Sequence, residues 1–464
     1  MAHCPFEITI KAEPPETNAQ KVICQELLRD IPGKRQIYSS LWEKQPVIVK
    51  IFADSVKSNR HLKRELSGLQ KLRSRNLNCP AVLFAGRTNR ASRVLVTKKI
   101  TDAPTALEIF ANLSSAEEKL DLLLIIVEEL ASHHDKGVLQ KDLHLGNILI
   151  KGRKAFIIDS AGMRFYNNAV NKKKSLAQLA MVARYLSPDN PSLIDRLAVA
   201  YCDARKRPFG HKEKNILYKC LAGTRKRGIR KGLKKSLRTS TRYLKIKKPA
   251  FVAIFGRTFI GDKNPDELVN NLDELMSKGN ILKNGNTCYV SRVFFNGFDI
   301  VVKRYNHKGV FHSIRQTIKK SRARKNWLCA RRLGMLQIPT AAPLGYIEVF
   351  KGPIIWKSYI ITRYLPGPKL CDLLKSTSSA SNRQSTAINQ VIELLKKLGK
   401  ARITHGDLKH SNIIITDKGP AVIDLDAMRA HKFKFTYKPR RAYDLKHFAT
   451  KGPAGKISLQ QLDE

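Results

Sequence analysis

One pattern of loop, strand, turn and strand occurs twice in the 464-residue sequence. The first copy is QKDLHLGNILIKGRKAFIIDSAGMR at 140–164, and the second is HGDLKHSNIIITDKGPAVIDLDAMR at 405–429. In both copies an Asp is followed five residues later by an Asn and 17 residues later by an Asp that ends an apolar strand. A single spacing of this kind arises easily by chance. Its recurrence at equal intervals predicts an internal repeat, and therefore two similar modules.

The recurring side chains are those that phosphoryl transfer from a nucleotide requires. One Asp takes the proton of the acceptor hydroxyl, while an Asn and a further Asp hold magnesium on the phosphates. Asp and Asn are also favoured in turns, so capping of two β-hairpins is the competing explanation. Repetition of the whole pattern favours the chemical explanation. It predicts Asp142 and Asp407 as catalytic residues and Asn147, Asp159, Asn412 and Asp424 as metal ligands.

An apolar strand with a lysine near its end precedes each repeat. Lys50 lies in PVIVKIF, and Lys303 lies in FDIVVKRY directly after the hairpin signal Asn296-Gly297. A charged residue inside such a strand is costly to bury unless it is paired or binds an anion. Both lysines are therefore predicted to hold nucleotide phosphates. An edge-strand lysine that points to water is the alternative.

The two modules differ in the acid available to orient this lysine. A helix predicted over 53–75 carries Glu65 beside its apolar stripe, where it can pair with Lys50 as the corresponding residues of kinases do. The segment after Lys303, residues 311–340, contains no acid. Either another carboxylate orients Lys303, or the second module binds nucleotide differently or poorly. The sequence therefore ranks Asp142 above Asp407 in its contribution to activity.

The charge is strongly basic, with 86 Lys and Arg against 38 Asp and Glu and a net charge of +48. Such a field attracts anionic membrane surfaces or nucleic acid. Between residues 204 and 250 Glu213 is the only acid, which predicts a basic junction there between modules at 1–203 and 251–464. The longest apolar run, at 122–127, is far shorter than the roughly 20 residues of a membrane span. The scattered cysteines and the lack of a signal-like start predict a cytoplasmic protein.

With both loops and lysines placed, the sequence resembles a tandem of protein-kinase-like domains. More narrowly, it is similar to the bacterial lipopolysaccharide core kinases of the heptose and Kdo kinase group. PGKRQIYSSLWEKQPVIVKIF and QKDLHLGNILI carry this resemblance in module one, and VVKRYN, YLPG, HGDLKHSNIII and IDLDAMR carry it in module two. It implies an α+β fold of two bilobal domains, each with a small β-rich lobe and a mainly helical lobe. Module one departs from the kinase pattern with Gln140-Lys141-Asp142 and Asp159-Ser160-Ala161.

The resemblance implies an ATP-dependent, Mg2+-requiring kinase that phosphorylates a sugar hydroxyl of the lipopolysaccharide inner core. Its expected substrate is lipopolysaccharide core or another anionic glycolipid. The protein is expected to act as a peripheral protein at the inner face of the cytoplasmic membrane. A protein or small-molecule kinase would use the same site chemistry. A non-catalytic kinase-like scaffold that binds anionic lipid or nucleic acid would not need the Asp and Asn residues. No specific nucleic-acid partner is expected, because aromatic residues make up only 7% of the chain.

Overall fold

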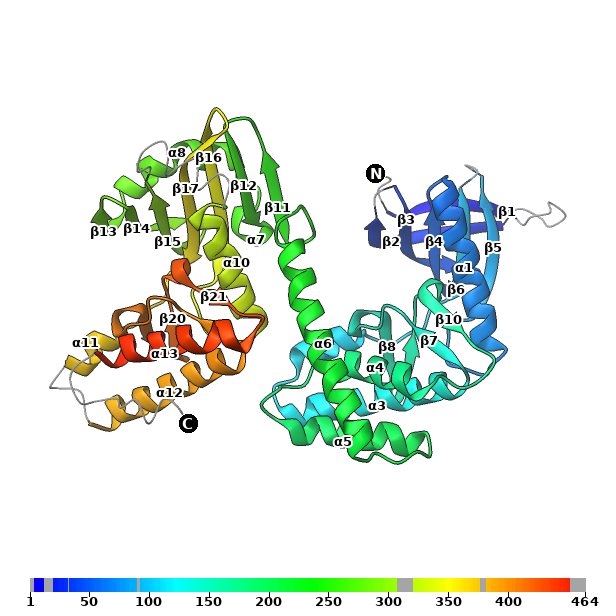
Figure 1. Cartoon of the computed structure of the whole chain (residues 1–464). Helices are drawn as coiled ribbons and strands as arrows, with labels where there is room; N and C mark the ends of the chain where they lie inside the picture. The colour runs from blue at the N-terminus through cyan, green and yellow to red at the C-terminus, as the bar shows by residue number, and fades with distance from the viewer. Residues whose placement is uncertain are drawn as a thin grey trace. The chain divides into compact units, whose positions relative to one another are not determined.

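The structure is a computed structural model that describes residues 4–11, 20–31, 33–89, 92–306, 320–375 and 381–450. It contains both helices and sheets, which confirms the mixed α and β composition expected from the sequence (Figure 1). The chain divides into two compact units, Met1–Arg227 and Gly228–Glu464, here called unit one and unit two. Within the described residues, no helix is both long and apolar enough to cross a membrane.

The sheet of unit one is a closed antiparallel barrel in the strand order β1-β2-β3-β4-β6-β5. Val47 and Val49 are fully buried in its interior, and because successive strand residues point to opposite faces, Lys50 faces the other way. Helix α1 covers this outer face through an apolar cluster that includes Leu62 and Leu69. The elements are β1 (Phe6–Lys11), β2 (Gln20–Ile31), β3 (Arg35–Trp42), β4 (Gln45–Phe52), α1 (Val56–Arg73), β5 (Val82–Thr88) and β6 (Arg93–Lys98).

The remainder of unit one is mainly helical and contains two two-stranded sheets, β7 with β10 and the hairpin of β8 and β9. Ser115 and Glu118 form a capping box at the start of α3. Gly137 follows the end of the helix in the left-handed conformation, at φ +71°, which glycine adopts readily and which commonly ends helices. The helices are α2 (Ala106–Asn112), α3 (Ala116–Asp135), α4 (Lys172–Ala183), α5 (Pro191–Ala204) and α6 (His211–Lys235). The strands are β7 (Val138–Gln140), β8 (Ile148–Lys151), β9 (Lys154–Ile157) and β10 (Met163–Phe165).

The residues predicted as a basic junction, 204–250, form regular structure. They contain the end of α5, helix α6 and strand β11, and the boundary between the two units falls within α6. Leu217 and Leu221 on α6 belong to the core of the helical part of unit one. Arg225 is half-buried and donates to the Leu186 carbonyl at 2.8 Å, so this cation has a structural contact within the unit.

The sheet of unit two has seven antiparallel strands in the order β11-β12-β16-β17-β15-β14-β13. Asn296 at φ 48° and Gly297 at φ 76° join β14 to β15, which confirms the predicted hairpin. The strands are β11 (Tyr243–Lys247), β12 (Phe251–Gly256), β13 (Asn280–Gly285), β14 (Cys288–Phe295), β15 (Phe298–Tyr305), β16 (Pro343–Lys351) and β17 (Ile354–Arg363). The helices α7 (Arg257–Ile260), α8 (Pro265–Ser277) and α10 (Arg322–Met335) accompany them.

The rest of unit two is mainly helical, like the corresponding part of unit one (Figure 1). Its helices are α11 (Leu370–Lys375), α12 (Ser381–Lys400) and α13 (Lys434–Thr450). Its short strands are β18 (Ile403–Thr404), β19 (Ile413–Thr416), β20 (Gly419–Val422) and β21 (Arg429–Ala430). Four single-turn 3-10 helices lie in the two repeated loops: η1 (Leu145–Asn147), η2 (Ser160–Gly162), η3 (His410–Asn412) and η4 (Leu425–Ala427).

Candidate active sites

The predicted lysine and glutamate of unit one form an ion pair. Lys50 on β4 donates to Glu65 on α1, whose side chain is only 1% exposed. Arg35 on β3 donates to Glu65 at 3.0 Å and lies 3.9 Å from the carboxylate of Asp159. Burial opposes ionisation of Glu65, but Lys50 and Arg35 outweigh it and hold its pKa below the usual value. The cluster therefore joins Lys50, Glu65 and Asp159 through Arg35, a residue that sequence reasoning did not identify.

Helix α1 is fixed against the turn that carries Asp159. The Ser160 hydroxyl donates to the Glu65 carbonyl at 2.7 Å. A Cβ placed on Gly68 would lie 2.7 Å from the Cβ of Ser160, so the close approach of helix and turn requires glycine there. Asp159 itself is left-handed, at φ 69°. Unit one has Ser160 where kinases commonly have Phe after the Asp, and this small side chain hydrogen-bonds directly to the backbone of α1.

The predicted loop residues of unit one are only partly brought together. The Ile158 amide donates to the Asn147 carbonyl at 2.9 Å, which places Asn147 next to the strand that leads to Asp159. The Asp142 side chain is 80% exposed, and the His144 ring lies 4.0 Å from its carboxylate. The Asn147 amide reaches only the Asp142 backbone carbonyl, at 3.4 Å. The Asp142 carboxylate is therefore weakly held.

Lys303 of unit two has two carboxylate partners. Its ammonium lies 2.6 Å from Asp424 and 2.9 Å from Asp426. Burial disfavours the charged lysine, but the two carboxylates outweigh burial and raise its pKa. The sequence left open whether another carboxylate orients Lys303, and the structure shows that Asp424 and Asp426 contact it, so the lack of an acid close in sequence no longer supports ranking the second module below the first. The acid lies outside the acid-free segment 311–340, of which residues 311–319 lie outside the described part.

Asp426 is the centre of a buried polar cluster that sequence reasoning missed. Its carboxylate, 12% exposed, accepts from Arg322 at 2.8 Å and from the Asn326 amide at 3.0 Å, as well as from the Tyr305 hydroxyl. Burial again opposes ionisation, yet Lys303 holds the pKa of Asp426 below its usual value. The available signal was the second Asp of IDLD, which stands two residues after the predicted metal ligand.

The two units thus place the same charge on different elements. In both, a helix follows the lysine strand, α1 after β4 and α10 after β15. Unit one carries its carboxylate on that helix and has Ala161 two residues after Asp159. Unit two has the amide of Asn326 on the helix and its carboxylate two residues after Asp424. Either arrangement supplies a buried negative charge to the lysine.

The side chain of Asp407, the predicted catalytic residue of unit two, is firmly positioned. Lys409 contacts the Asp407 carboxylate at 3.0 Å, and the Asn412 amide donates to the same oxygen at 3.2 Å. Partial burial opposes ionisation, but these two donors hold the pKa of Asp407 below its usual value. The carboxylate of buried Asp444 on α13 accepts from the backbone amides of His405 and Gly406 at 2.6 and 2.8 Å. Asp444 thereby fixes the loop just before Asp407.

In both units a backbone hydrogen bond joins the predicted Asn to the residue before the predicted Asp. In unit two the Ile423 amide donates to the Asn412 carbonyl at 2.9 Å, which repeats the contact between Ile158 and Asn147. Asp159 and Asp424 are both left-handed, and their side chains are 33% and 36% exposed. Among the described residues, no group of three or more His, Cys, Asp or Glu is suited to a metal. An Asn and Asp pair therefore fits magnesium shared with nucleotide phosphates rather than an all-protein cage.

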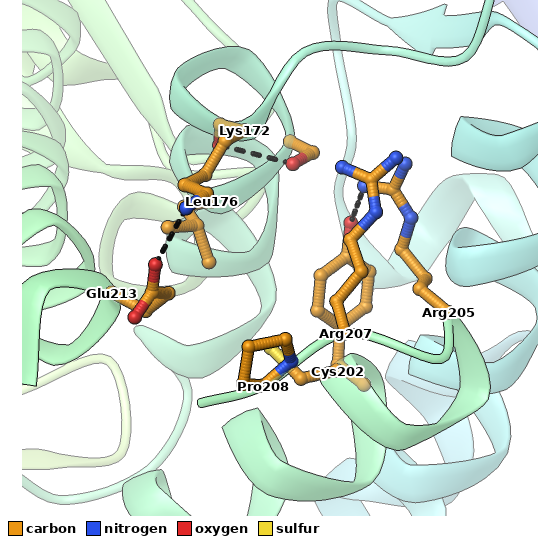
Figure 2. A pocket seen from close by; sticks show the side chains of 9 residues that line it. Lys172, Leu176, Cys202, Arg205, Arg207, Pro208 and Glu213 are labelled. Carbon is orange, nitrogen blue, oxygen red and sulfur yellow. Dashed lines mark hydrogen bonds and ion pairs between the residues drawn. The ribbon is translucent and has the colours of Figure 1, made fainter. Parts of the chain in front are cut away.

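A cavity of about 180 Å³ in unit one lies apart from these residues, between α4, α5 and the start of α6 (Figure 2). Two of its cations are compensated within the unit. Lys172 pairs with Glu213 at 2.7 Å, and Arg205 pairs with Asp135 at 2.8 Å. None of the site residues predicted from the sequence lines this cavity.

Comparison with known proteins gives one family match. Residues 276–451 match the family described as Lipopolysaccharide kinase (Kdo/WaaP) family. The match covers less than half of the chain and lies entirely within unit two, where it includes Lys303, Asp407, Asn412 and Asp424. No curated protein matches the chain. The family match supports a kinase related to lipopolysaccharide synthesis.

Proposed function

We propose that the chain is a tandem of two bilobal kinase-like modules and that unit two transfers phosphate from ATP to a sugar hydroxyl of the lipopolysaccharide inner core. The observation that carries this proposal is the cluster of Lys303, Asp424 and Asp426, together with a well-positioned Asp407, inside the segment that matches the lipopolysaccharide kinase family. The chemistry of these residues supports phosphoryl transfer, and the family match supports the acceptor class.

In the proposed mechanism Asp407 orients the acceptor hydroxyl and takes its proton. Despite partial burial, the contacts from Lys409 and Asn412 hold the pKa of Asp407 below its usual value, so the carboxylate is free of its own proton at neutral pH. Asn412 and Asp424 would hold magnesium, which when bound would neutralise charge on the phosphates. Lys303 holds the nucleotide phosphates, and Asp426 orients the lysine ammonium before nucleotide arrives. Because the lysine is already ordered, nucleotide binding has a smaller entropic cost.

Unit one retains a complete set of proposed nucleotide contacts. Lys50 with Glu65 would hold phosphates, and Asn147 with Asp159 would supply oxygens to magnesium. Its proposed proton acceptor Asp142 is exposed and weakly held, whereas Asp407 accepts two side-chain contacts. We therefore propose that unit two carries most of the transfer activity and that unit one binds nucleotide with lower turnover, which reverses the ranking expected from the sequence.

The proposed site of action is the cytoplasmic face of the inner membrane. The +48 charge favours an acceptor that carries acidic sugars and phosphates, and it favours an anionic leaflet. Lys226, Arg227, Lys234 and Lys235 on α6 are exposed cations suited to such contacts. Arg225 is omitted because its contact with Leu186 is structural. Charge reversal at the four exposed cations tests this contribution without removing that hydrogen bond.

The deciding experiment offers labelled ATP and Mg2+ to the purified chain together with inner-core lipopolysaccharide, a protein mixture or nucleic acid. We expect label on the lipopolysaccharide sugar, with transfer lowered roughly 100-fold or more in Asp407→Asn and kept in Asp299→Asn, a surface variant of the same unit. Label on protein instead would establish a protein kinase. No transfer to any acceptor, together with no ATP binding, would favour the scaffold alternative.

A further inference from the structure

Two exposed phenylalanines stack on each other at the start of helix α13. The rings of Phe433 and Phe435 are 5.4 Å apart with planes 17° from parallel, and the residues are 47% and 73% exposed. An exposed pair of large apolar rings is costly in water and commonly marks an interaction surface. We call this surface the aromatic–basic edge; it consists of Arg402, Lys432, Phe433, Lys434, Phe435 and Lys438.

Lys432 and Lys434 flank Phe433 in the sequence, and Lys438 follows Phe435 by three residues. The Lys432 ammonium lies 4.8 Å from the centre of the Phe433 ring, and Arg402 donates to the Lys432 carbonyl at 3.5 Å. Lys434 and Lys438 are four residues apart on α13 and so share one helix face. No acid occurs between residues 427 and 443. Exposed rings among Lys and Arg are the composition of segments that lie in the interface of an anionic membrane.

The aromatic–basic edge is joined at both ends to the loop that carries Asp407. Before the edge, β21 pairs with β18, and His431 contacts the Thr404 hydroxyl at 2.8 Å. After it, the carboxylate of Asp444 on α13 accepts from the Gly406 amide at 2.8 Å. A membrane that held the edge would therefore lie beside the residues that position Asp407.

We propose that the aromatic–basic edge docks unit two on an anionic phospholipid bilayer and so presents Asp407 to an acceptor embedded in that bilayer. The relation to Asp407 rests on the proposed function; the docking itself does not. The rings would enter the headgroup boundary while the cations contact lipid phosphates. A single-stranded nucleic acid fits less well, because Phe433 already stacks on Phe435 and lies close to Lys432.

The binding test is sedimentation of the full chain with vesicles of phosphatidylethanolamine and phosphatidylglycerol. The variant combines Phe433→Ala with Phe435→Ala, and the matched control is Phe294→Ala, which removes a phenylalanine that is 71% exposed elsewhere in unit two. We expect the double variant to bind roughly tenfold or more weakly, given the apolar area withdrawn from the bilayer, and the control to bind normally. Unchanged binding of the double variant, or equal loss in the control, would overturn the proposal.

A second measurement separates docking from catalysis and from folding. Thermal unfolding should be the same in the double variant and the parent chain, because both rings are exposed. Phosphate transfer should fall for acceptor embedded in vesicles and persist for acceptor dispersed in detergent. If no acceptor is phosphorylated, the proposed function fails while vesicle binding still tests docking. A change from dimer to monomer without loss of vesicle binding would identify the edge as a contact between copies of the chain and reject the lipid assignment.

Discussion

Replacement of Asp426 by Asn tests the source of the negative charge that orients Lys303. The substitution keeps the size of the side chain and removes its charge. Four side-chain donors contact Asp426, from Lys303, Arg322, Asn326 and Tyr305. Removing one partner from a buried ion pair usually costs about 3–5 kcal/mol of stability. We expect the lower end, about 3 kcal/mol, because Asp424 still contacts Lys303 at 2.6 Å.

The same substitution should also lower transfer in the variant that remains folded. With Asp426 neutral, Lys303 would be held by Asp424 alone, and the same carboxylate would also be needed for magnesium. We expect kcat/KM for ATP to fall roughly 100-fold, which corresponds to about 2.7 kcal/mol. Initial rates are measured at saturating Mg2+ and at a temperature where urea titration shows that the variant is folded.

A rescue variant distinguishes orientation of Lys303 from general damage to the fold. Asn326 contacts Asp426 at 3.0 Å, so Asn326→Glu places a carboxylate in the same cluster but on the helix, as in unit one. Adding it to Asp426→Asn should restore at least tenfold of the lost kcat/KM. The matched control is Asp299→Asn, which breaks an exposed pair with Arg292 worth about 0–1 kcal/mol. Wild-type kcat/KM in folded Asp426→Asn would refute the argument.

Three further results are expected. Asp407→Asn should lower transfer roughly 100-fold or more and Asp142→Asn less, measured on core lipopolysaccharide; the opposite order would assign the main activity to unit one. In a chain that carries Lys303→Met, Glu65→Gln should weaken binding of a fluorescent ATP analogue about tenfold, because Lys50 loses a charged hydrogen bond. Burial lowers the pKa of His134 to about 3, so the unfolded chain binds more protons between pH 6.5 and 3, and stability should fall as pH falls, by about 2 kcal/mol at pH 5. Equilibrium unfolding at pH 7 and pH 5 should show a smaller difference in His134→Gln, and an equal difference would contradict this assignment.

The sequence pattern predicted several structural features that involve residues close together in the chain. The hairpin at Asn296-Gly297 follows from two residues that adopt positive φ readily, and the pairing of Lys50 with Glu65 follows from a strand and the helix directly after it. Both sites of the repeated pattern place an Asn next to the strand that ends in the second Asp. These contacts depend on short separations and on secondary-structure periods, which a sequence displays directly.

The contacts that the sequence did not predict join residues far apart in the chain. Asp426 lies more than a hundred residues after Lys303, and nothing in the spacing says that the turn after Asp424 folds back onto the lysine strand. Arg35 was not identified because its partners Glu65 and Asp159 come from a helix and a loop. The closed barrel of unit one likewise depends on the pairing of β1 with β5, which alternation within either strand does not specify.

The different positions of the carboxylate give the two units different ways to control the lysine. In unit one Glu65 lies on α1, which also contacts Ser160 of the Asp159 turn, so displacement of α1 from β4 would separate Glu65 from Lys50. In unit two Asp424 and Asp426 come from a single turn, so the lysine and the proposed magnesium ligand are positioned together. Helix α10 contributes the neutral Asn326 and the cation Arg322, both directed at Asp426. Displacement of α10 would therefore leave Lys303 paired, whereas displacement of α1 would leave Lys50 without its acid.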